Sequence, residues 1–146
     1  MLKDVEKLRN LTGAGVMECK RALDETSGDV DKALELIQER GYIKAEKKAS
    51  RATGAGFLEV YIHNNRVGVL LELRCETDFA AHSDPFKHLA HELVMQIAAM
   101  NPGNKEELLK QVYIKDANLT IKDVIKTAIA KIGENIRIER FCRYEV

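Results

Sequence analysis

The spacing of the apolar residues changes at Phe57, and this change restricts the possible folds more than any other feature of the sequence. Upstream, residues such as Val5, Leu8 and Leu11 recur every three or four positions, which is the pattern of amphipathic helices. Downstream, over residues 58–75, apolar and polar residues alternate, which is the pattern of strands with one buried face. The change predicts an α+β protein.

Three short helices are predicted in the first 43 residues. They are separated by Thr-Gly-Ala-Gly at residues 12–15 and by Ser-Gly-Asp at residues 27–29. Glycine permits a tight turn, and Asp29 can cap the helix that follows it. The third apolar stripe runs to Gly41, which is expected to end that helix. Three helices joined by such short turns can bury a small core of their own, so residues 1–43 are predicted to form a separate module.

A basic run separates this module from the rest of the chain. Residues 44–51, Lys-Ala-Glu-Lys-Lys-Ala-Ser-Arg, are charged and nearly free of apolar side chains. Thr53 and two glycines follow and mark a boundary. Residues 44–54 are therefore predicted to be an exposed linker, which can be helical, and residues 55–146 to be the second unit.

A small antiparallel sheet is predicted in the second unit. Residues 57–63 and 67–75 form a hairpin, because the asparagines at 64–65 tolerate the positive φ of a tight turn. Residues 135–146 are predicted to be a further strand. Phe141 falls out of its alternation, which indicates a bulge or a change of facing.

Helices are expected to cover this sheet. A long helix begins at Asp84, with proline in its first turn, and a short helix is expected over residues 108–112. Thr120 is the expected cap of the last helix, and Gly133 is expected to end it.

Charge and cysteine content restrict the class of function. Lys plus Arg equals Asp plus Glu at 23 each, which argues against a nucleic-acid binder. An accessory factor that binds RNA through residues 44–51 stays as a rival interpretation.

No apolar stretch approaches about 20 residues, so no membrane span is predicted, and no leader pattern precedes the first helix. Three widely spaced cysteines, Cys19, Cys75 and Cys142, favour a reducing cytoplasm.

Enzyme and ligand sites find little support in the sequence. Neither Thr-Gly-Ala-Gly segment has the pattern of a phosphate loop, so no direct nucleotide binding is expected. His82, His88 and His91 lack the spacing of a metal site, and exposed histidines are the favoured interpretation. Cys75 could be a nucleophile, but it continues the apolar face of the hairpin and is better explained as a core residue. We expect no catalytic residue, no metal and no cofactor.

Phe79 is harder to explain by packing alone. It lies in the polar connection Thr-Asp-Phe-Ala-Ala-His-Ser-Asp at residues 77–84, between the hairpin and the long helix. A large aromatic side chain there can either fill the protein's own core or protrude as an anchor for a partner. The sequence leaves both alternatives open.

Three segments of the chain resemble signatures of the elongation factor Ts family. Residues 8–23, Leu-Arg-Asn-Leu-Thr-Gly-Ala-Gly-Val-Met-Glu-Cys-Lys-Arg-Ala-Leu, resemble the first, and residues 28–33 with 40–41 resemble its continuation. Residues 75–81, Cys-Glu-Thr-Asp-Phe-Ala-Ala, resemble the second, and residues 130–136, Ala-Lys-Ile-Gly-Glu-Asn-Ile, the third. The resemblance implies a helical module similar to a ubiquitin-associated domain, followed by an α+β core. It indicates a short form with one core module and no inserted coiled coil.

The resemblance also implies a function. Family members are guanine nucleotide exchange factors that bind elongation factor Tu and release GDP by disturbing its Mg²⁺ and phosphate site, without enzymatic activity of their own. The positions that match the family's contact segments are Leu11, Thr12, Gly13, Ala14, Gly15, Thr77, Asp78, Phe79, Ala80, Ile132 and Gly133.

The sequence also leaves room for other partners and other functions. The exposed edge of the C-terminal strand, near Cys142, favours a homodimer. The expected location is the bacterial cytoplasm, or the matrix or stroma of an organelle. The main rival function is an adaptor that binds another protein through the ubiquitin-associated-type module and has no exchange activity.

Overall fold

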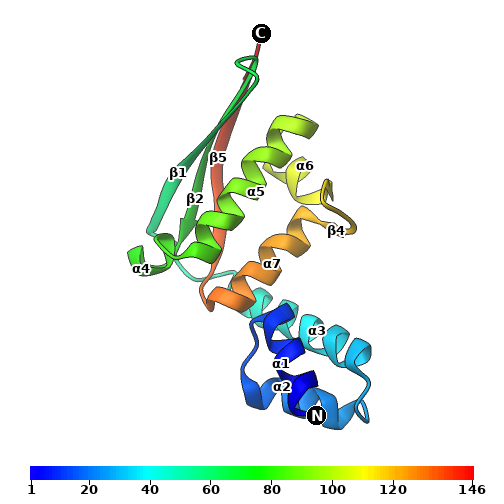
Figure 1. Ribbon diagram of the computed structural model, residues 1–146. Helices are drawn as coiled ribbons and strands as arrows, with labels where there is room; N and C mark the ends of the chain where they lie inside the picture. Colours follow the sequence, from blue (N-terminus) through cyan, green and yellow to red (C-terminus); the bar gives the residue numbers. More distant parts are fainter.

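The molecule is elongated, with a helical end and an end built on a sheet (Figure 1). The computed structural model describes residues 1–146. The helical end contains α1 (Leu2–Thr12), α2 (Val16–Glu25) and the first part of α3 (Val30–Lys48). Together with the strands described below, these helices confirm the predicted α+β class.

The turns between the first three helices lie where the sequence predicts them. Gly13 ends α1 with φ 70°, and Gly28 has φ 84° in the turn before α3. The Asp29 side chain caps α3 by accepting hydrogen bonds from two backbone N–H groups of its first turn. The three helices enclose a core made of Val5, Leu8, Cys19, Ala22, Leu23, Ala33 and Ile37.

The prediction that Gly41 ends the third helix is wrong. α3 continues through Gly41 to Lys48, so the first half of the expected linker is helical. A glycine inside a helix costs only about 1 kcal/mol relative to alanine. Ala45, one turn further on, is buried in the core of the sheet-bearing end, and this burial offsets the cost. The division of the chain into units at residues 43 and 54 stays a prediction.

The sheet consists of β1 (Ala55–His63), β2 (Val67–Cys75) and β5 (Ile136–Glu145), in the order β1-β2-β5. Both pairs are antiparallel. Asn64 and Asn65 have φ 53° and 56°, which confirms the predicted hairpin turn. The register between β2 and β5 shifts by one residue at Glu139, two positions before Phe141, so of the two predicted alternatives, a bulge or a change of facing, the structure shows a bulge.

Helices cover one face of this sheet. α5 (Asp84–Met100) lies along it, and α7 (Ile121–Ile132) packs against α5 (Figure 1). Thr120 forms a capping box with Asp123 at the start of α7, and Gly133, with φ 85°, ends it, as predicted. Phe86, Leu93 and Ile97 of α5 are completely or almost completely buried against the sheet.

A second, smaller hairpin was not predicted. The short helix α6 (Lys105–Lys110) stops before Val112, which begins β3 (Val112–Tyr113), paired with β4 (Asp116–Thr120). Gln96 of α5 holds this hairpin: its side chain donates to the carbonyl oxygen of Val112 and accepts from the N–H of Ile114. A buried amide with both of its groups satisfied fixes the hairpin on α5.

The opposite face of the sheet carries no helix (Figure 1). It presents exposed apolar side chains from all three strands, namely Leu58, Val60, Ile62, Leu70, Cys142 and Tyr144. β5 is also an edge strand, as the sequence predicted. None of the helices combines the length and the apolar character needed to cross a membrane.

Candidate docking site

The loop between α1 and α2 lies directly against the last turn of α7. A Cβ atom placed on Gly13 would lie only 3.0 Å from Cγ of Lys131. The loop is internally braced, because the Thr12 hydroxyl donates to the carbonyl oxygen of Leu8 and accepts from the N–H of Ala14. The structure therefore brings residues 11–15 together with Ile132 and Gly133, although about 120 residues separate them in the sequence.

Glu134 connects the end of α7 to the segment that contains Phe79. Its Oε1 accepts hydrogen bonds from the N–H groups of Glu76 and Thr77, at 3.1 and 2.9 Å. Its Oε2 accepts from the Thr77 hydroxyl at 2.7 Å. In return, the Asn135 N–H donates to a carboxylate oxygen of Glu76 at 2.8 Å. Glu134 thus connects the end of α7 to the Phe79 segment, and Gly13 lies beside the same end of α7. We call the three segments expected from the sequence, residues 11–15, 77–80 and 132–133, the docking ridge.

Phe79 protrudes from this ridge. It lies in α4 (Asp78–Ala81), whose N-terminal cap is the Thr77 side chain, which accepts from the N–H of Ala80. Ala80 and Ala81 are buried, so the opposite side of this short helix faces solvent. The side chain of Phe79 is 90% exposed. Of the two alternatives that the sequence left open, the structure selects the protruding side chain.

Three further residues in or next to the segments of the docking ridge were not predicted from the sequence. Val16 and Met17, the first two residues of α2, are exposed apolar residues that directly follow residues 11–15. Met17 lies off the buried stripe of α2, which is a signal that could have revealed it, whereas Val16 continues the spacing of Cys19 and Leu23 and gives no such signal. Glu134 was also missed, because its role depends on partners 57 and 58 positions away.

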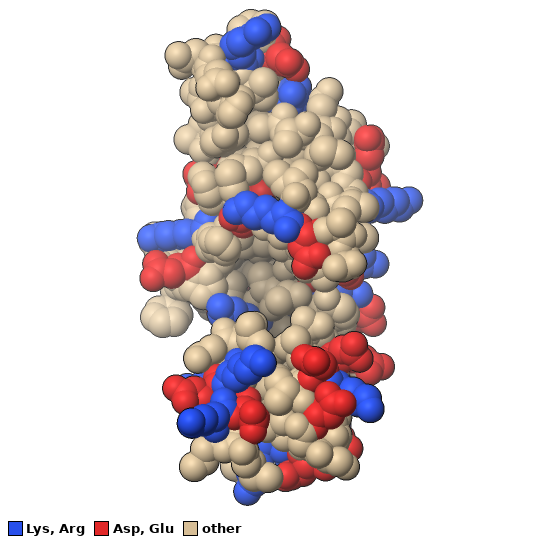
Figure 2. Space-filling view, turned by 45° about the vertical axis from the view of Figure 1, so that its right-hand side comes forward, with Lys and Arg blue, Asp and Glu red and all other residues tan.

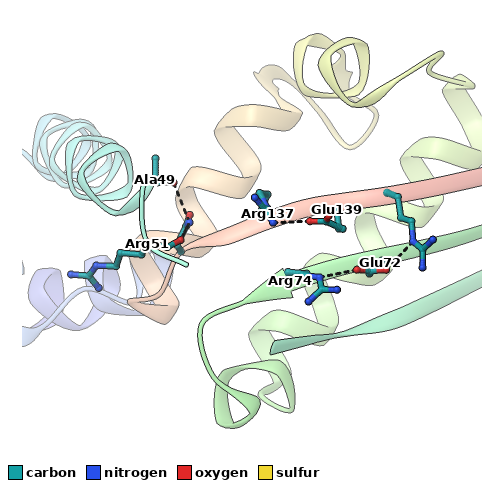
Figure 3. Close-up of polar contacts among 8 residues, drawn as sticks. Ala49, Arg51, Glu72, Arg74, Arg137 and Glu139 are labelled. Carbon is teal, nitrogen blue, oxygen red and sulfur yellow. Dashed lines mark hydrogen bonds and ion pairs between the residues drawn. The ribbon is translucent and has the colours of Figure 1, made fainter. Parts of the chain in front are cut away.

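The end of α3 is fixed to the same region. The side-chain amide of Asn135 donates to the carbonyl oxygens of Ala49 and Arg51, at 3.4 and 2.9 Å (Figure 3). Asn135 is itself buried. The segment that follows α3 is therefore held by Asn135, the residue just before β5, and is not a free extended linker.

Alternating charges lie on the outer face of the sheet beside the ridge. Glu72 bridges Arg74 and Arg140, with N–O distances of 2.7 and 2.9 Å, and Arg137 pairs with Glu139 at 2.7 Å (Figure 3). The hydrogen bond from Arg74 makes the largest contribution to holding the pKa of Glu72 below its usual value, and the hydrogen bond from Arg140 makes the next largest. Figure 2 shows the molecule turned so that the helix-covered side comes forward, and both signs of charge are mixed there without a continuous basic stripe of the kind that binds nucleic acid.

A cavity of about 270 Å³ lies between α5, α7 and β4. Its buried carboxylate, Glu92, accepts hydrogen bonds from the Tyr113 hydroxyl and from Lys115 Nζ, both at 2.6 Å. Burial acts to raise the pKa of Glu92, but the hydrogen bonds from Lys115 and Tyr113 outweigh it and hold this pKa below its usual value. Burial and the bond to Glu92 raise the pKa of Tyr113. Both groups are thus occupied in fixing the second hairpin.

The residues considered for enzymatic chemistry do not gather. Burial raises the pKa of Cys75, whose thiol donates to the carbonyl oxygen of Thr77, so it stays protonated and is a core residue as predicted. His82 bonds to the carbonyl oxygen of Asp78, and His91 lies edge-on to Tyr61. No group of three or more potential metal ligands is found.

Removal of the Glu134 carboxylate is expected to loosen the Phe79 segment. Hydrogen bonds to a charged acceptor contribute about 1.5–3 kcal/mol each, so Glu134→Ala should speed hydrogen exchange at the Thr77 amide by about tenfold or more. NMR-detected exchange would measure this, with Glu139→Ala as the control, because Glu139 pairs only with Arg137 at the surface. Equal Thr77 protection in both variants would contradict the role given to Glu134.

A braced ridge that carries one bare aromatic side chain is typical of a protein that acts by docking onto another protein. Comparison with known proteins then identifies the family. The family model described as Elongation factor TS matches residues 76–146. The elongation factor Ts of Thermotoga neapolitana is 42% identical, over 97% of this chain and 94% of that protein.

Further relatives agree. The elongation factor Ts of Herpetosiphon aurantiacus is 38% identical over 99% of this chain and 96% of its own. A chloroplastic elongation factor Ts of Cyanidioschyzon merolae is 42% identical over 96% of this chain and 90% of that protein. The chain therefore belongs to the elongation factor Ts family of translation elongation factors. The match to the Thermotoga protein extends over 186 positions against 146 residues here, so that relative has at least 40 positions without a counterpart in this chain.

Proposed function

We propose that this protein is the guanine nucleotide exchange factor of elongation factor Tu, and that it binds the GDP form and promotes release of GDP. The single observation that carries the proposal is the bare Phe79 side chain on a braced ridge. A protruding aromatic of this kind has no role in the protein's own core, and isolated aromatics dominate the binding energy of protein interfaces.

Each segment of the docking ridge has a proposed task. Residues 11–15 dock on the GTPase domain of elongation factor Tu. Asp78 and Phe79, flanked by Thr77 and Ala80, push into it beside the magnesium site, and Ile132 and Gly133 press on the helix that follows the phosphate loop. Main-chain amides and Mg²⁺ form the cradle that holds the phosphates, so a small displacement weakens GDP binding.

The energetics follow from linkage. If the factor binds the nucleotide-free GTPase more tightly than the GDP form, it must weaken GDP binding by the same ratio. Exchange by this route needs no covalent bond to be made or broken, so we propose that the protein is not an enzyme and needs no nucleotide, metal or cofactor of its own. It would act where translation takes place, in the bacterial cytoplasm or in an organelle.

A second copy of the chain is a further proposed partner. The free edge of β5 borders the apolar outer face of the sheet. Cys142 lies in this edge strand, and its exposed side chain belongs to that face. Exposed apolar patches of this kind typically mark interfaces. Unpaired strand edges also favour pairing between chains.

Sedimentation equilibrium at micromolar concentration is expected to give twice the monomer mass of 16.5 kDa. Cys142→Arg, which places a charge on this face, is expected to give the monomer mass, because burying an unpaired charge is strongly unfavourable. Met100→Arg alters an apolar side chain that is also exposed but lies on α5, and should leave the dimer intact. A monomeric wild-type protein would refute the dimer.

The exchange function itself is tested by release of a fluorescent GDP analogue from bacterial elongation factor Tu. Strong acceleration by substoichiometric amounts of this protein is expected, because each molecule can act repeatedly. Binding without acceleration would favour the alternative, an adaptor that uses only its helical module. Absence of binding by the folded protein would refute both.

A further inference from the structure

α3 is the one element that belongs to both ends of the molecule. Ala33 and Ile37 in its first half are buried in the core of the helical end, and Ala45 is buried in the core of the sheet-bearing end. Between them lies Gly41, which is buried where α3 crosses α7. The orientation of the two ends therefore depends on this crossing.

Gly41 allows the two helices to come unusually close. A Cβ atom on Gly41 would lie 3.1 Å from the Cβ of Ala130, closer than side chains normally pack. Two small residues that face each other permit close approach of helix backbones. The crossing is flanked on α3 by Tyr42 and Glu46, and Lys126 of α7 lies 2.7 Å from the Glu46 carboxylate and 5.9 Å from the Tyr42 ring centre.

Residues 11–15, which we call the docking loop, lie beside the same crossing. A small cavity of about 70 Å³ is bounded by Leu11 and Thr12 at the end of α1, by Gly41 and Tyr42 of α3, and by Ala130 of α7. Gly13 touches Lys131, the next residue of α7. A change in the separation of α3 and α7 would therefore move residues 11–15 relative to Phe79.

We infer that Gly41 is a positioning residue for nucleotide exchange: its missing side chain sets the distance between α3 and α7, and thereby holds the docking loop and Phe79 in one fixed geometry. This inference rests on the proposed exchange function. Two surfaces that contact the same partner bind it more tightly when they already have the bound geometry, because no free energy is then lost in arranging them. Exchange also requires that Phe79 arrives at the correct place once the loop has docked, because small misplacements are costly.

Substitution of Gly41 separates positioning from stability. Alanine is a better helix former than glycine, so Gly41→Ala should not weaken α3 itself. The added methyl group should nevertheless push α7 away. Ala130→Gly removes the opposing methyl group, so the double variant Gly41→Ala with Ala130→Gly should restore the spacing. Gly41→Leu gives a larger displacement, and Glu39→Leu adds the same side chain at an exposed position of α3 as a control.

The displacement can be measured directly and without any partner. Spin labels at Glu35→Cys on α3 and Lys105→Cys on α6, in a Cys142→Ser background, report the distance between the two ends. Both positions are exposed, and Cys19 and Cys75 are buried, so they should not be labelled. Wild-type Gly41 and the Glu39→Leu control should give one narrow distance distribution, and Gly41→Leu a shifted or broad one. A broad distribution with Gly41 in place would overturn the inference.

Exchange assays provide the second readout. At saturating concentration, Gly41→Leu should lower the rate of GDP release by about tenfold or more, with a smaller change in the half-saturating concentration. Gly41→Ala should lose activity that Ala130→Gly restores. Full activity of Gly41→Leu beside an active wild type would overturn the inference and leave the proposed function intact. An inactive wild type would refute the proposed function, while the spin-label distances would still decide whether Gly41 sets the geometry.

Discussion

An alanine in place of Phe79 is expected to lower the maximal rate of GDP release from elongation factor Tu by roughly 30- to 1,000-fold, which corresponds to about 2–4 kcal/mol for a central aromatic anchor. The side chain is 90% exposed, so its removal leaves the protein's own core and stability unchanged. Docking through residues 11–15 should persist. Stopped-flow release of a fluorescent GDP analogue would give the rate, and calorimetric binding to the nucleotide-free GTPase the affinity.

Two variants make this result specific to the aromatic anchor. Val112→Ala removes another exposed apolar side chain, in the second hairpin away from the docking ridge, and should have no effect on release. Phe79→Leu keeps part of the apolar volume and should fall between the wild type and Phe79→Ala. GDP release that is equally fast with Phe79→Ala would exclude this side chain from the mechanism.

The largest loss of stability is expected from Gly56→Ala. Gly56 has φ 155°, and a Cβ atom there would lie 2.2 Å from the carbonyl oxygen of Leu73 and 2.9 Å from Cα of Arg74. Both are main-chain atoms of β2, which cannot move without breaking the hairpin. The steric overlap and the disfavoured φ should together reduce the free energy of unfolding by about 3–5 kcal/mol.

Thermal unfolding would measure this loss as a fall in Tm of about 10 °C or more. Gly68→Ala is the matched control, because Gly68 lies in β2, has an ordinary φ and has open space around its Cα. Its replacement should change stability little. A Gly56→Ala protein as stable as the wild type would show that the hairpin can rearrange around the new methyl group.

Local signals in the sequence were sufficient for much of the fold. The change of apolar period located the sheet, and the asparagine pair located the hairpin turn. Thr120 and Gly133 marked the two ends of α7, because caps and left-handed terminal residues act on their immediate neighbours. Even the bulge in β5 was visible, since the displaced Phe141 interrupts a strict alternation.

What could not be predicted depends on contacts between distant parts of the chain. In the sequence, Gly41 has the pattern of a residue that ends a helix. Its actual role depends on Ala130, which lies against it in the structure. The second hairpin has only two residues in β3, too few for an alternation, and it is held by Gln96 of another helix. The exposure of Phe79 follows from the burial of the two alanines beside it. The links that bring residues 11–15 and the Phe79 segment to the end of α7 also join distant parts of the chain, so they could be found only in three dimensions.

The strand order β1-β2-β5 also determines how the sheet must assemble in time. β1 reaches β2 through a short turn, whereas the partners of β2 in β5 range from Ile136, opposite Cys75, to Glu145, opposite Val67. Hairpins close in about 1–10 μs, but pairings between distant segments form more slowly. Until β5 docks, the inner edge of β2 stays open to strands of other chains. Addition of the third strand is thus the step at which the folding chain is most liable to aggregate.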